Sequence, residues 1–292
     1  MTPPVAAPQT PRRSSAIRPT LPLAGDRLAR FETFVAGLRP VFQRSDQFLR
    51  CRAYLRGLLE PGERKNVEAI AAAAAAVMTV EADLSQALQH FVSHSPWDVY
   101  RLLAAVRATA PPDPAAAWVI HDGVFVKKGR HSVGVQRQYA RAVGKKLNCQ
   151  VAVVLGRAGP GGYLPLAARL YLPGQWLKDH AEQAERTIPD DHRRGQTKAE
   201  IALELLDVVR AEDPTARPVD AEDGYRTSPS FADGLAARGL TAGDGARLPA
   251  ALEQFERLKA GLGLDHFEGR TWAGWHHHVG LVFTAAHFLA TV

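Results

Sequence analysis

The spacing of apolar residues changes at a single proline-rich break, and that change limits the folds the chain can adopt. Before a proline-rich break at Pro111–Pro114, apolar residues recur every three or four positions, as in amphipathic helices. After the break, Trp118–Ile120 is an apolar run rich in β-branched residues, and Ser132–Tyr139 alternates valines with polar positions. Both patterns predict strands. The sequence therefore predicts a helical region followed by a region that mixes helices and strands.

Helices are predicted throughout the region before the break. They are a helix that begins near Asp26, one over Asp46–Leu59, one that opens at Arg64–Asn66, one over Glu81–Val92, and one capped by Ser95-Pro96 with Asp98 in its first turn. Arginines and lysines are scattered over their polar faces. A basic helical module of this kind is a candidate DNA binder, and the alternative is an ordinary bundle with solvated charged faces.

Strands and helices follow one another after the break. The predicted strands are Trp118–Asp122, Ser132–Tyr139, Asn148–Leu155, Tyr163–Leu172 and Pro218–Ala221. The predicted helices are Gln175–Ala184, Lys198–Arg210, Pro229–Arg238, Ala250–Leu262 and Trp275–Leu289. Antiparallel strands, then helix, strand and helix, with an acid at the ends of two strands, is the order of a ribonuclease-H-like core. We expect an α/β (α+β) protein, with an all-helical N-terminal region before a ribonuclease-H-like mixed sheet flanked by helices.

Asp122 directly follows the first apolar strand. It precedes Gly123, and the basic pair Lys127 and Lys128 comes close behind. A carboxylate at a strand end, beside a tight turn and a basic pair, suits a site that holds a divalent metal against a phosphate. An Asp before a Gly is also a common turn residue, so spacing alone leaves both interpretations open.

Composition limits the number of domains, the class of partner and the cellular compartment that we expect for this protein. The 292 residues suffice for one large domain or two, and the net charge of +6 fits either a polyanionic partner or an ordinary basic protein. Cys51 and Cys149 are too few for a disulfide framework, which favours a reduced, intracellular setting. Residues 1–25 are predicted to be a disordered basic tail and not a signal peptide. No apolar run is long enough to span a membrane.

Eight stretches of the chain, in the same order, resemble the bacterial insertion-sequence transposases of the DDE superfamily. They are Arg30–Phe42, Tyr54–Asn66, Leu88–Asp98, Lys127–Tyr139, Asn148–Leu155, Arg169–Pro173, Thr197–Leu206 and Gly263–Leu281. Together they cover nearly the whole chain after the tail. The resemblance implies a helical DNA-binding domain over residues 26–110 and a ribonuclease-H-like DDE catalytic domain over residues 115–292.

The activity implied by the resemblance is cleavage and strand transfer of transposon DNA. Three acidic residues hold Mg²⁺ or Mn²⁺ in such enzymes, and two metals activate first water and then the freed 3′-hydroxyl. Carboxylates are suitable ligands because Mg²⁺ is a hard cation. The implied partners are double-stranded DNA, as transposon ends and target, and a second copy of the chain on that DNA. The implied location is the cytoplasm, at the nucleoid and away from membranes.

The family's acids map unevenly onto this chain. Asp122 matches the first acid, and Glu222 stands at the position of the second. Asp223, or less closely Asp220, is the substitute for Glu222 if the backbone shifts. The resemblance therefore implies a metal site built on Asp122 and Glu222, with Asp223 as the alternative catalytic acid.

The third acid is expected seven positions before a DNA-contacting lysine that matches Lys259. That position holds Leu252, and the nearest acid is Glu253. One residue is roughly 100° on a helix, so Glu253 faces away from the site unless the helix shifts. Arg247 is the closest residue to an arginine expected before this acid. The DNA-binding residues implied by the resemblance are Lys127, Lys128, Arg247 and Lys259.

A short bridge replaces a long, strand-rich insertion that the family usually carries between its second and third acids. Here Leu240–Ala250 spans the gap, so the chain resembles a transposase with an internal deletion near residues 240–250. One interpretation is an active transposase that uses Asp122, Glu222 or Asp223, and Glu253 around Mg²⁺. The alternative is a catalytically inactive, decayed transposase that at most binds DNA. A third is a ribonuclease-H-like nuclease without transposition, which needs the same convergence of carboxylates.

Several histidines and one tyrosine are further candidates for site residues. The three consecutive residues His276–His278 cannot all point one way on a helix, so we expect a buried final helix there and not a metal site. For His121 we expect burial with satisfied polar atoms, or exposure, more than contact with a metal site. Tyr139 is expected to serve packing and hydrogen bonding.

Overall fold

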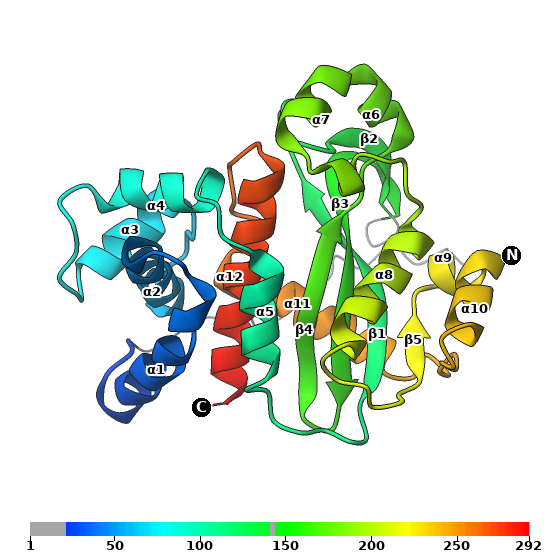
Figure 1. The fold of residues 1–292 in the computed structure, drawn as a ribbon, viewed down its shortest axis with the longest axis horizontal. Coiled ribbons are helices and arrows are strands. Elements are labelled where there is room, and N and C mark those ends of the chain that lie inside the picture. Colours follow the sequence, from blue (N-terminus) through cyan, green and yellow to red (C-terminus); the bar gives the residue numbers. More distant parts are fainter. Residues whose placement is uncertain (1–21, 141–143, 292) are drawn as a thin grey trace, which may run out of the picture.

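The computed structural model describes residues 22–140 and 144–291, and it arranges them around one central sheet (Figure 1). Strand β1 (Ala117–Val126) pairs antiparallel with β3 (Lys145–Gly159) on one edge and parallel with β5 (Val219–Ala221) on the other. The opposite edge of β3 pairs antiparallel with β4 (Gly162–Leu170) and with β2 (Gln136–Ala140). The strand order is therefore β2-β3-β1-β5, with β4 also paired to β3.

Helices cover both faces of this sheet. Helix α8 (Lys198–Arg210) packs on β3 and β4 with a cluster that includes Ile120 and Val153. Helices α11 (Leu248–Leu262) and α12 (Trp272–Ala290) lie on the other face, with a cluster that includes Val119 and Val154. Alternate residues of β1 thus face opposite layers, as the pleat of a strand requires. An antiparallel meander, a crossover helix and a parallel strand confirm the predicted ribonuclease-H-like mixed sheet.

A layer of helices from the N-terminal region packs against the far side of α12 (Figure 1). These helices are α1 (Gly25–Gly37), α2 (Ser45–Leu59), α3 (Val67–Ala75), α4 (Leu84–Ser93) and α5 (Val99–Arg107). Residues 274–288 of α12 are all buried, since the helix lies between this layer and the sheet. A helix that is apolar on all of its faces is normally buried on all of them. The two predicted domains therefore share one hydrophobic core around α12.

Shorter helices complete the fold. The pair α6 (Gly174–Asp179) and α7 (Ala181–Thr187) lies at one end of the sheet, beyond β4 (Figure 1). Beside β5 lie α9 (Asp223–Arg226) and α10 (Pro229–Ala236). Single 3-10 turns occur at Arg39–Val41 and Asp190–His192.

Three predictions about local structure were wrong. Asp122 and Gly123 lie in the middle of β1 and not at a strand end or turn. A side chain at Gly123 would meet Phe255 at 3.2 Å, so this glycine admits a close neighbour and does not mark a turn. The last helix of the N-terminal layer is capped by the Asp98 carboxylate, which accepts from the backbone of Tyr100, and not by Ser95-Pro96.

The predicted basic tail lies mostly outside the described residues, which begin at Pro22. Leu23, which falls within the predicted tail, is buried in the core, and its carbonyl accepts a hydrogen bond from Arg56 at 2.8 Å. Both cysteines, Cys51 and Cys149, are buried and unpaired. Across the described part of the chain, no helix is both long enough and apolar enough to span a membrane.

Candidate functional site

Asp122 of β1 lies next to Glu222, the residue directly after β5, because these two strands are parallel neighbours in the sheet. The register pairs Ile120 of β1 with Ala221 of β5. The backbone N–H of Glu222 donates to the Ile120 carbonyl at 3.1 Å, and the backbone N–H of Asp122 donates to Glu222 Oε2 at 2.8 Å. The structure therefore brings together the first two acids that the resemblance implies.

Both oxygens of the Asp122 carboxylate are engaged by other side chains. Lys198 Nζ lies 2.5 Å from Oδ2, and the Tyr225 hydroxyl donates to Oδ1 at 2.7 Å. The Asp122 side chain is 10% exposed and that of Lys198 is 37% exposed. Burial and the nearby Asp122 charge raise the pKa of Tyr225 well above its ordinary value, so its phenol remains a donor. The Lys198 ammonium group therefore neutralises the Asp122 carboxylate, and the Tyr225 hydroxyl donates a hydrogen bond to it.

Lys198 is positioned by the start of α8. The Thr197 side chain accepts from the backbone N–H of Glu200 at 3.2 Å, and the Glu200 carboxylate accepts from the backbone N–H of Thr197 at 2.7 Å. This reciprocal capping box fixes the first turn of the helix, where Lys198 is the first residue. Tyr225 is held by α9, the short helix that begins directly after Glu222.

The other two predicted catalytic acids point away from this pair. The Asp223 side chain is 78% exposed at the start of α9 and lies 3.8 Å from Arg226. Glu253 is exposed on α11 and lies 2.5 Å from Arg257. Ala251 and Phe255 form the buried face of that helix, and Glu253 falls between them, roughly 160–200° from either. Within residues 22–140 and 144–291, no three His, Cys, Asp or Glu side chains are grouped so that they could hold a metal ion.

The residues present do not fit a two-metal centre. Such a centre needs several free carboxylate oxygens that converge on shared cations. Here Lys198 and Tyr225 occupy the oxygens of Asp122, and Glu253 lies on the exposed face of α11. We therefore derive no chemical step through a metal at this site.

Asp220 organises the short bridge before α11. Its carboxylate is fully buried and accepts from the backbone N–H groups of Gly245, at 3.0 Å, and Arg247, at 3.4 Å. A Cβ on Gly243 would lie 2.0 Å from Asp220 Oδ1, so only glycine fits there. The bridge also forms a parallel contact between Val219 and Ala242. Asp220 thus has a structural task and is not a substitute for Glu222.

Two of the predicted DNA-contacting residues, Arg247 and Lys259, lie close to carboxylates of the chain itself. The Arg247 guanidinium lies 3.8 Å from buried Asp220. Lys259 is 14% exposed, with Nζ 3.3 Å from Glu256 and 5.8 Å from the centre of the Phe125 ring.

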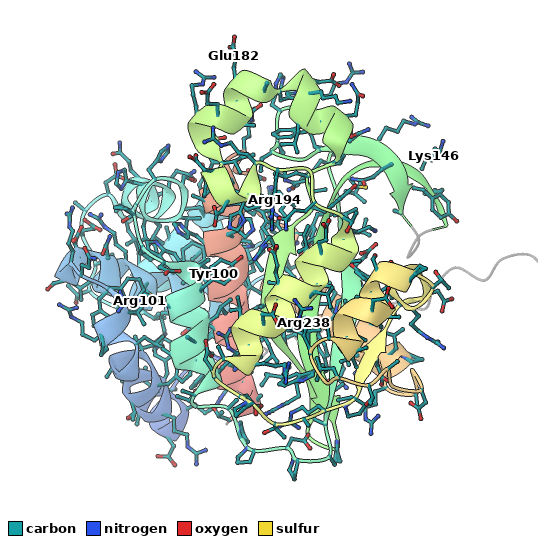
Figure 2. The ribbon with its side chains drawn as sticks, turned by 45° about the vertical axis from the view of Figure 1, so that its right-hand side comes forward. Tyr100, Arg101, Lys146, Glu182, Arg194 and Arg238 are labelled. Atoms are coloured by element: carbon teal, nitrogen blue, oxygen red, sulfur yellow. The ribbon has the colours of Figure 1, made fainter. Side chains whose placement is uncertain are left out.

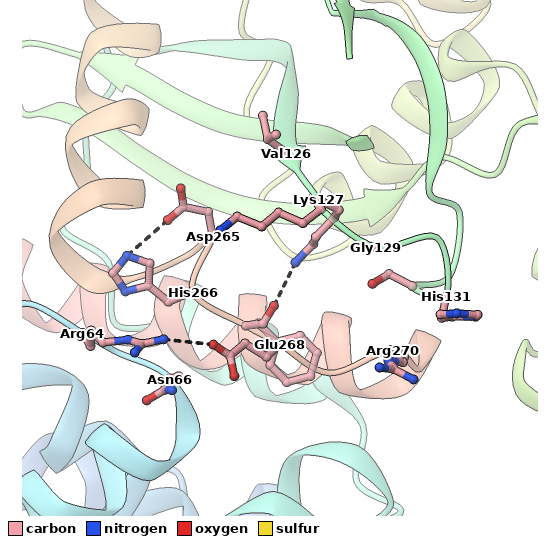
Figure 3. A pocket seen from close by; sticks show the side chains of 13 residues that line it. Arg64, Asn66, Val126, Lys127, Gly129, His131, Asp265, His266, Glu268 and Arg270 are labelled. Atoms are coloured by element: carbon pink, nitrogen blue, oxygen red, sulfur yellow. Dashed lines mark hydrogen bonds and ion pairs between the residues drawn. The ribbon is translucent and has the colours of Figure 1, made fainter. Parts of the chain in front are cut away.

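Lys127 and Lys128 line a cleft of about 450 Å³ between the end of β1, the segment before α3 and the loop before α12 (Figure 3). Lys127 Nζ donates to the Phe267 carbonyl at 2.8 Å, and burial lowers its pKa. Arg64 and Glu268 pair across the mouth at 3.2 Å. Lys128 is exposed, and no acidic side chain of the described residues pairs with it. Of the four predicted contacts, Lys128 is therefore the one best placed to meet a phosphate.

His121 and the three consecutive histidines His276–His278 have internal hydrogen-bond partners. His121 is buried, with Nε2 2.9 Å from the Tyr163 hydroxyl and Nδ1 3.3 Å from the Asp122 backbone carbonyl, as the preferred interpretation expected. His276, His277 and His278 are all buried, and each has a ring nitrogen within 3.0 Å of a backbone carbonyl. The prediction of a buried final helix is confirmed.

A ribonuclease-H-like sheet that places an acid of one strand beside the acid directly after its parallel neighbour is typical of the DDE nucleases. A family model described as DDE superfamily endonuclease matches residues 37–254, which is most of the chain. The chain belongs to this family. Its members act on DNA and generally use divalent metals such as Mg²⁺. Comparisons with curated proteins and with solved structures found no match.

Sequence reasoning missed the two side chains that hold Asp122. Lys198 lies 76 residues after Asp122 and Tyr225 lies 103 residues after it. Lys198 is the first residue of a predicted amphipathic helix, and Tyr225 stands three residues after Glu222. These positions along the chain do not by themselves reveal a contact with Asp122.

Proposed function

We propose that this protein is a transposase-type DNA-binding protein that no longer cuts DNA. The observation that carries the proposal is the state of Asp122, whose two oxygens are held by Lys198 and Tyr225. The outward direction of Glu253 supports it, because a metal-dependent cut needs a third carboxylate near the first two. In this proposal, the family's fold remains while its chemistry has been lost.

DNA binding is the part of the ancestral activity that the remaining features favour. The family acts on DNA, and the net charge of +6 suits a polyanionic partner. The proposed ligand is double-stranded DNA that carries the ends of an insertion sequence. The proposal also includes binding of the DNA by two copies of the chain, at the nucleoid in the cytoplasm.

An active transposase is the second candidate, and the contact between Asp122 and Glu222 favours it. These acids adjoin as a metal site would require. Lys198 is more than a third exposed, so its ammonium group has room to leave Asp122. Activity would further require Glu253, or another acid, to reach the pair.

Nicking of supercoiled plasmid DNA separates the two candidates. The plasmid should carry the sequences that flank the gene, and the protein should be tested in Mg²⁺ and in Mn²⁺ beside an Asp122→Ala variant. We expect both proteins to retard the DNA in a gel and neither to nick it above background. Nicking by the native chain that disappears in the variant would establish the enzyme instead. Absence of any DNA binding would reject the proposed function.

A further inference from the structure

A long part of the central sheet is free of acidic residues. No Asp or Glu occurs from Gly123 to Lys178, while lysines and arginines recur throughout this stretch. The acidic residues of the chain, nearly as numerous as the basic ones, are therefore concentrated elsewhere. This segment includes the end of β1, all of β2 and β3, and β4. The net positive charge of the protein is accordingly concentrated in this segment.

Strand β2 and the first residues of β3 form a two-stranded ribbon, which we call the basic ribbon and define as residues 136–140 and 145–149. In its register Tyr139 lies opposite Lys146, and Arg137 lies opposite Asn148. Since alternate residues share a face, Arg137, Tyr139 and Lys146 lie on one face of the ribbon. All three are exposed, and Tyr139 is 57% exposed. The expectation that Tyr139 is a packing residue is wrong, because more than half of this residue is exposed.

The ribbon lies at the margin of the molecule. Figure 2 shows Lys146 at the outer end of these strands, far in that view from Arg101 on α5. Its other face packs through Ala140 and Cys149 against Val124 of β1. The ribbon is therefore anchored on one face and open on the other.

A neighbouring loop extends the same positive surface. The Asn148 side-chain amide donates to the carbonyls of Lys127, at 2.7 Å, and Gly129, at 2.8 Å. These bonds hold Lys128 and Arg130, both exposed, beside the ribbon. Five exposed cations lie on this surface: Lys128, Arg130, Arg137, Lys145 and Lys146. Exposed cations that are gathered in one place attract an anionic partner.

We propose that the basic ribbon is the arm by which this protein holds the backbone of duplex DNA. This inference rests on the proposed function and assigns its binding surface. A two-stranded β-ribbon has dimensions that the major groove admits. Its lysines and arginines would meet phosphates on either side of the groove, and the Tyr139 hydroxyl would donate to a phosphate oxygen. Contacts of this kind position the duplex and give affinity without reading its sequence.

The decisive measurement is the salt dependence of binding to a short duplex oligonucleotide. The test protein is the full chain with Arg137→Ala and Lys146→Ala. We expect its affinity near 0.1 M salt to fall roughly 10- to 100-fold, and the slope of log affinity against log salt to decrease by about 2. The conservative pair Arg137→Lys and Lys146→Arg should keep both values close to native.

The matched control removes the same charge from another part of the surface. Arg194→Ala with Arg238→Ala takes away two cations that already pair with Glu204 and Asp207 (Figure 2). We expect the control to bind with nearly the native slope, and circular dichroism to show that both double variants are folded. Equal slopes for the ribbon variant and the native chain would overturn the ribbon assignment while leaving DNA binding intact. Absence of binding by the native chain would overturn the proposed function and this assignment together.

Discussion

At the scale of single residues, the charge balance at Asp122 decides what the site can do. Lys198 supplies one positive charge at 2.5 Å, in the region where a bound cation would neutralise the carboxylate. An ammonium group satisfies the charge, yet it cannot activate water as a metal ion does. The side chain of Lys198 therefore stabilises Asp122 and also competes with any divalent ion for it.

This competition leads to a prediction about metal binding. The variant Lys198→Ala should bind Mn²⁺ more tightly than the native chain, by on the order of 10-fold or more, because a nearby positive charge has been removed. The affinity is measured by electron paramagnetic resonance of free Mn²⁺, which is independent of any DNA cleavage.

Two further variants are controls for the measurement of Mn²⁺ affinity. The variant Lys198→Arg keeps the positive charge and should behave as the native chain. The variant Lys198→Ala with Asp122→Asn should lose the gained affinity. Equal Mn²⁺ affinity of the native chain and the Lys198→Ala variant would contradict the idea that Lys198 competes with a divalent ion for Asp122.

The acids of the site were predictable only in part. Asp122 and Glu222 adjoin as expected, and the outward direction of Glu253 follows from its position one residue away from the expected place. The engagement of Asp122 by Lys198 was not predictable, because periodicity describes neighbours along one helix or strand. A contact between residues 76 positions apart depends on the crossover of α8 over the sheet.

At the scale of elements, α2 and α3 can cross closely because Gly57 has no side chain. A Cβ on Gly57 would lie 2.1 Å from the Ile70 carbonyl oxygen and 2.8 Å from Ile70 Cγ2. The two helices are therefore as close as their backbones permit. Any larger residue at position 57 must push them apart.

The variant Gly57→Ala tests this contact. It should lower the free energy of unfolding by about 2–3 kcal/mol, because the obstacle is backbone and not a flexible side chain. Gly37→Ala on α1 is the matched control, since a Cβ at that position would meet no atom within 4 Å. That control should be neutral or stabilise by up to about 1 kcal/mol. Urea denaturation measures both, and equal midpoints would show that the crossing tolerates a methyl group.

Element boundaries followed from the sequence where periodicity was strong. Helix α8 spans the predicted Lys198–Arg210, because its apolar stripe is continuous and Thr197 caps it. Strand β2 begins at Gln136 and not at Ser132, since residues 132–135 form a turn and the backbone N–H of Val133 donates to the Arg270 carbonyl. Alternation of valines alone did not reveal that tertiary contact.

At the scale of the whole molecule, buried histidines make the fold sensitive to acid. Burial lowers the pKa of His276 to about 3, and of His121, His278 and His287 to about 4. In the unfolded chain the same groups take up protons near pH 6.5. The unfolded state therefore binds more protons as the pH falls below 6.5, and stability falls with it until the folded pKa values are reached.

The expected result is a steep loss of thermal stability between pH 6.5 and pH 5. Each of the four histidines should contribute a loss of roughly 1–2 kcal/mol by pH 5, which together is comparable to the whole stability of a typical domain. Calorimetry across this range measures the effect before most carboxylates titrate. The exposed His131→Ala variant should leave the slope unchanged. A melting temperature that is constant from pH 6.5 to pH 5 would contradict the prediction.

The central position of α12 also has a consequence for biosynthesis. Every strand and helix that it contacts is translated earlier, so neither the helical layer nor one face of the sheet can close until residues 272–290 have left the ribosome. Until then both surfaces expose apolar side chains that favour aggregation and recruit chaperones. A frameshift or stop codon between Tyr225 and Trp272 would therefore yield a product destined for proteolysis, even though every residue of the Asp122 site had been made.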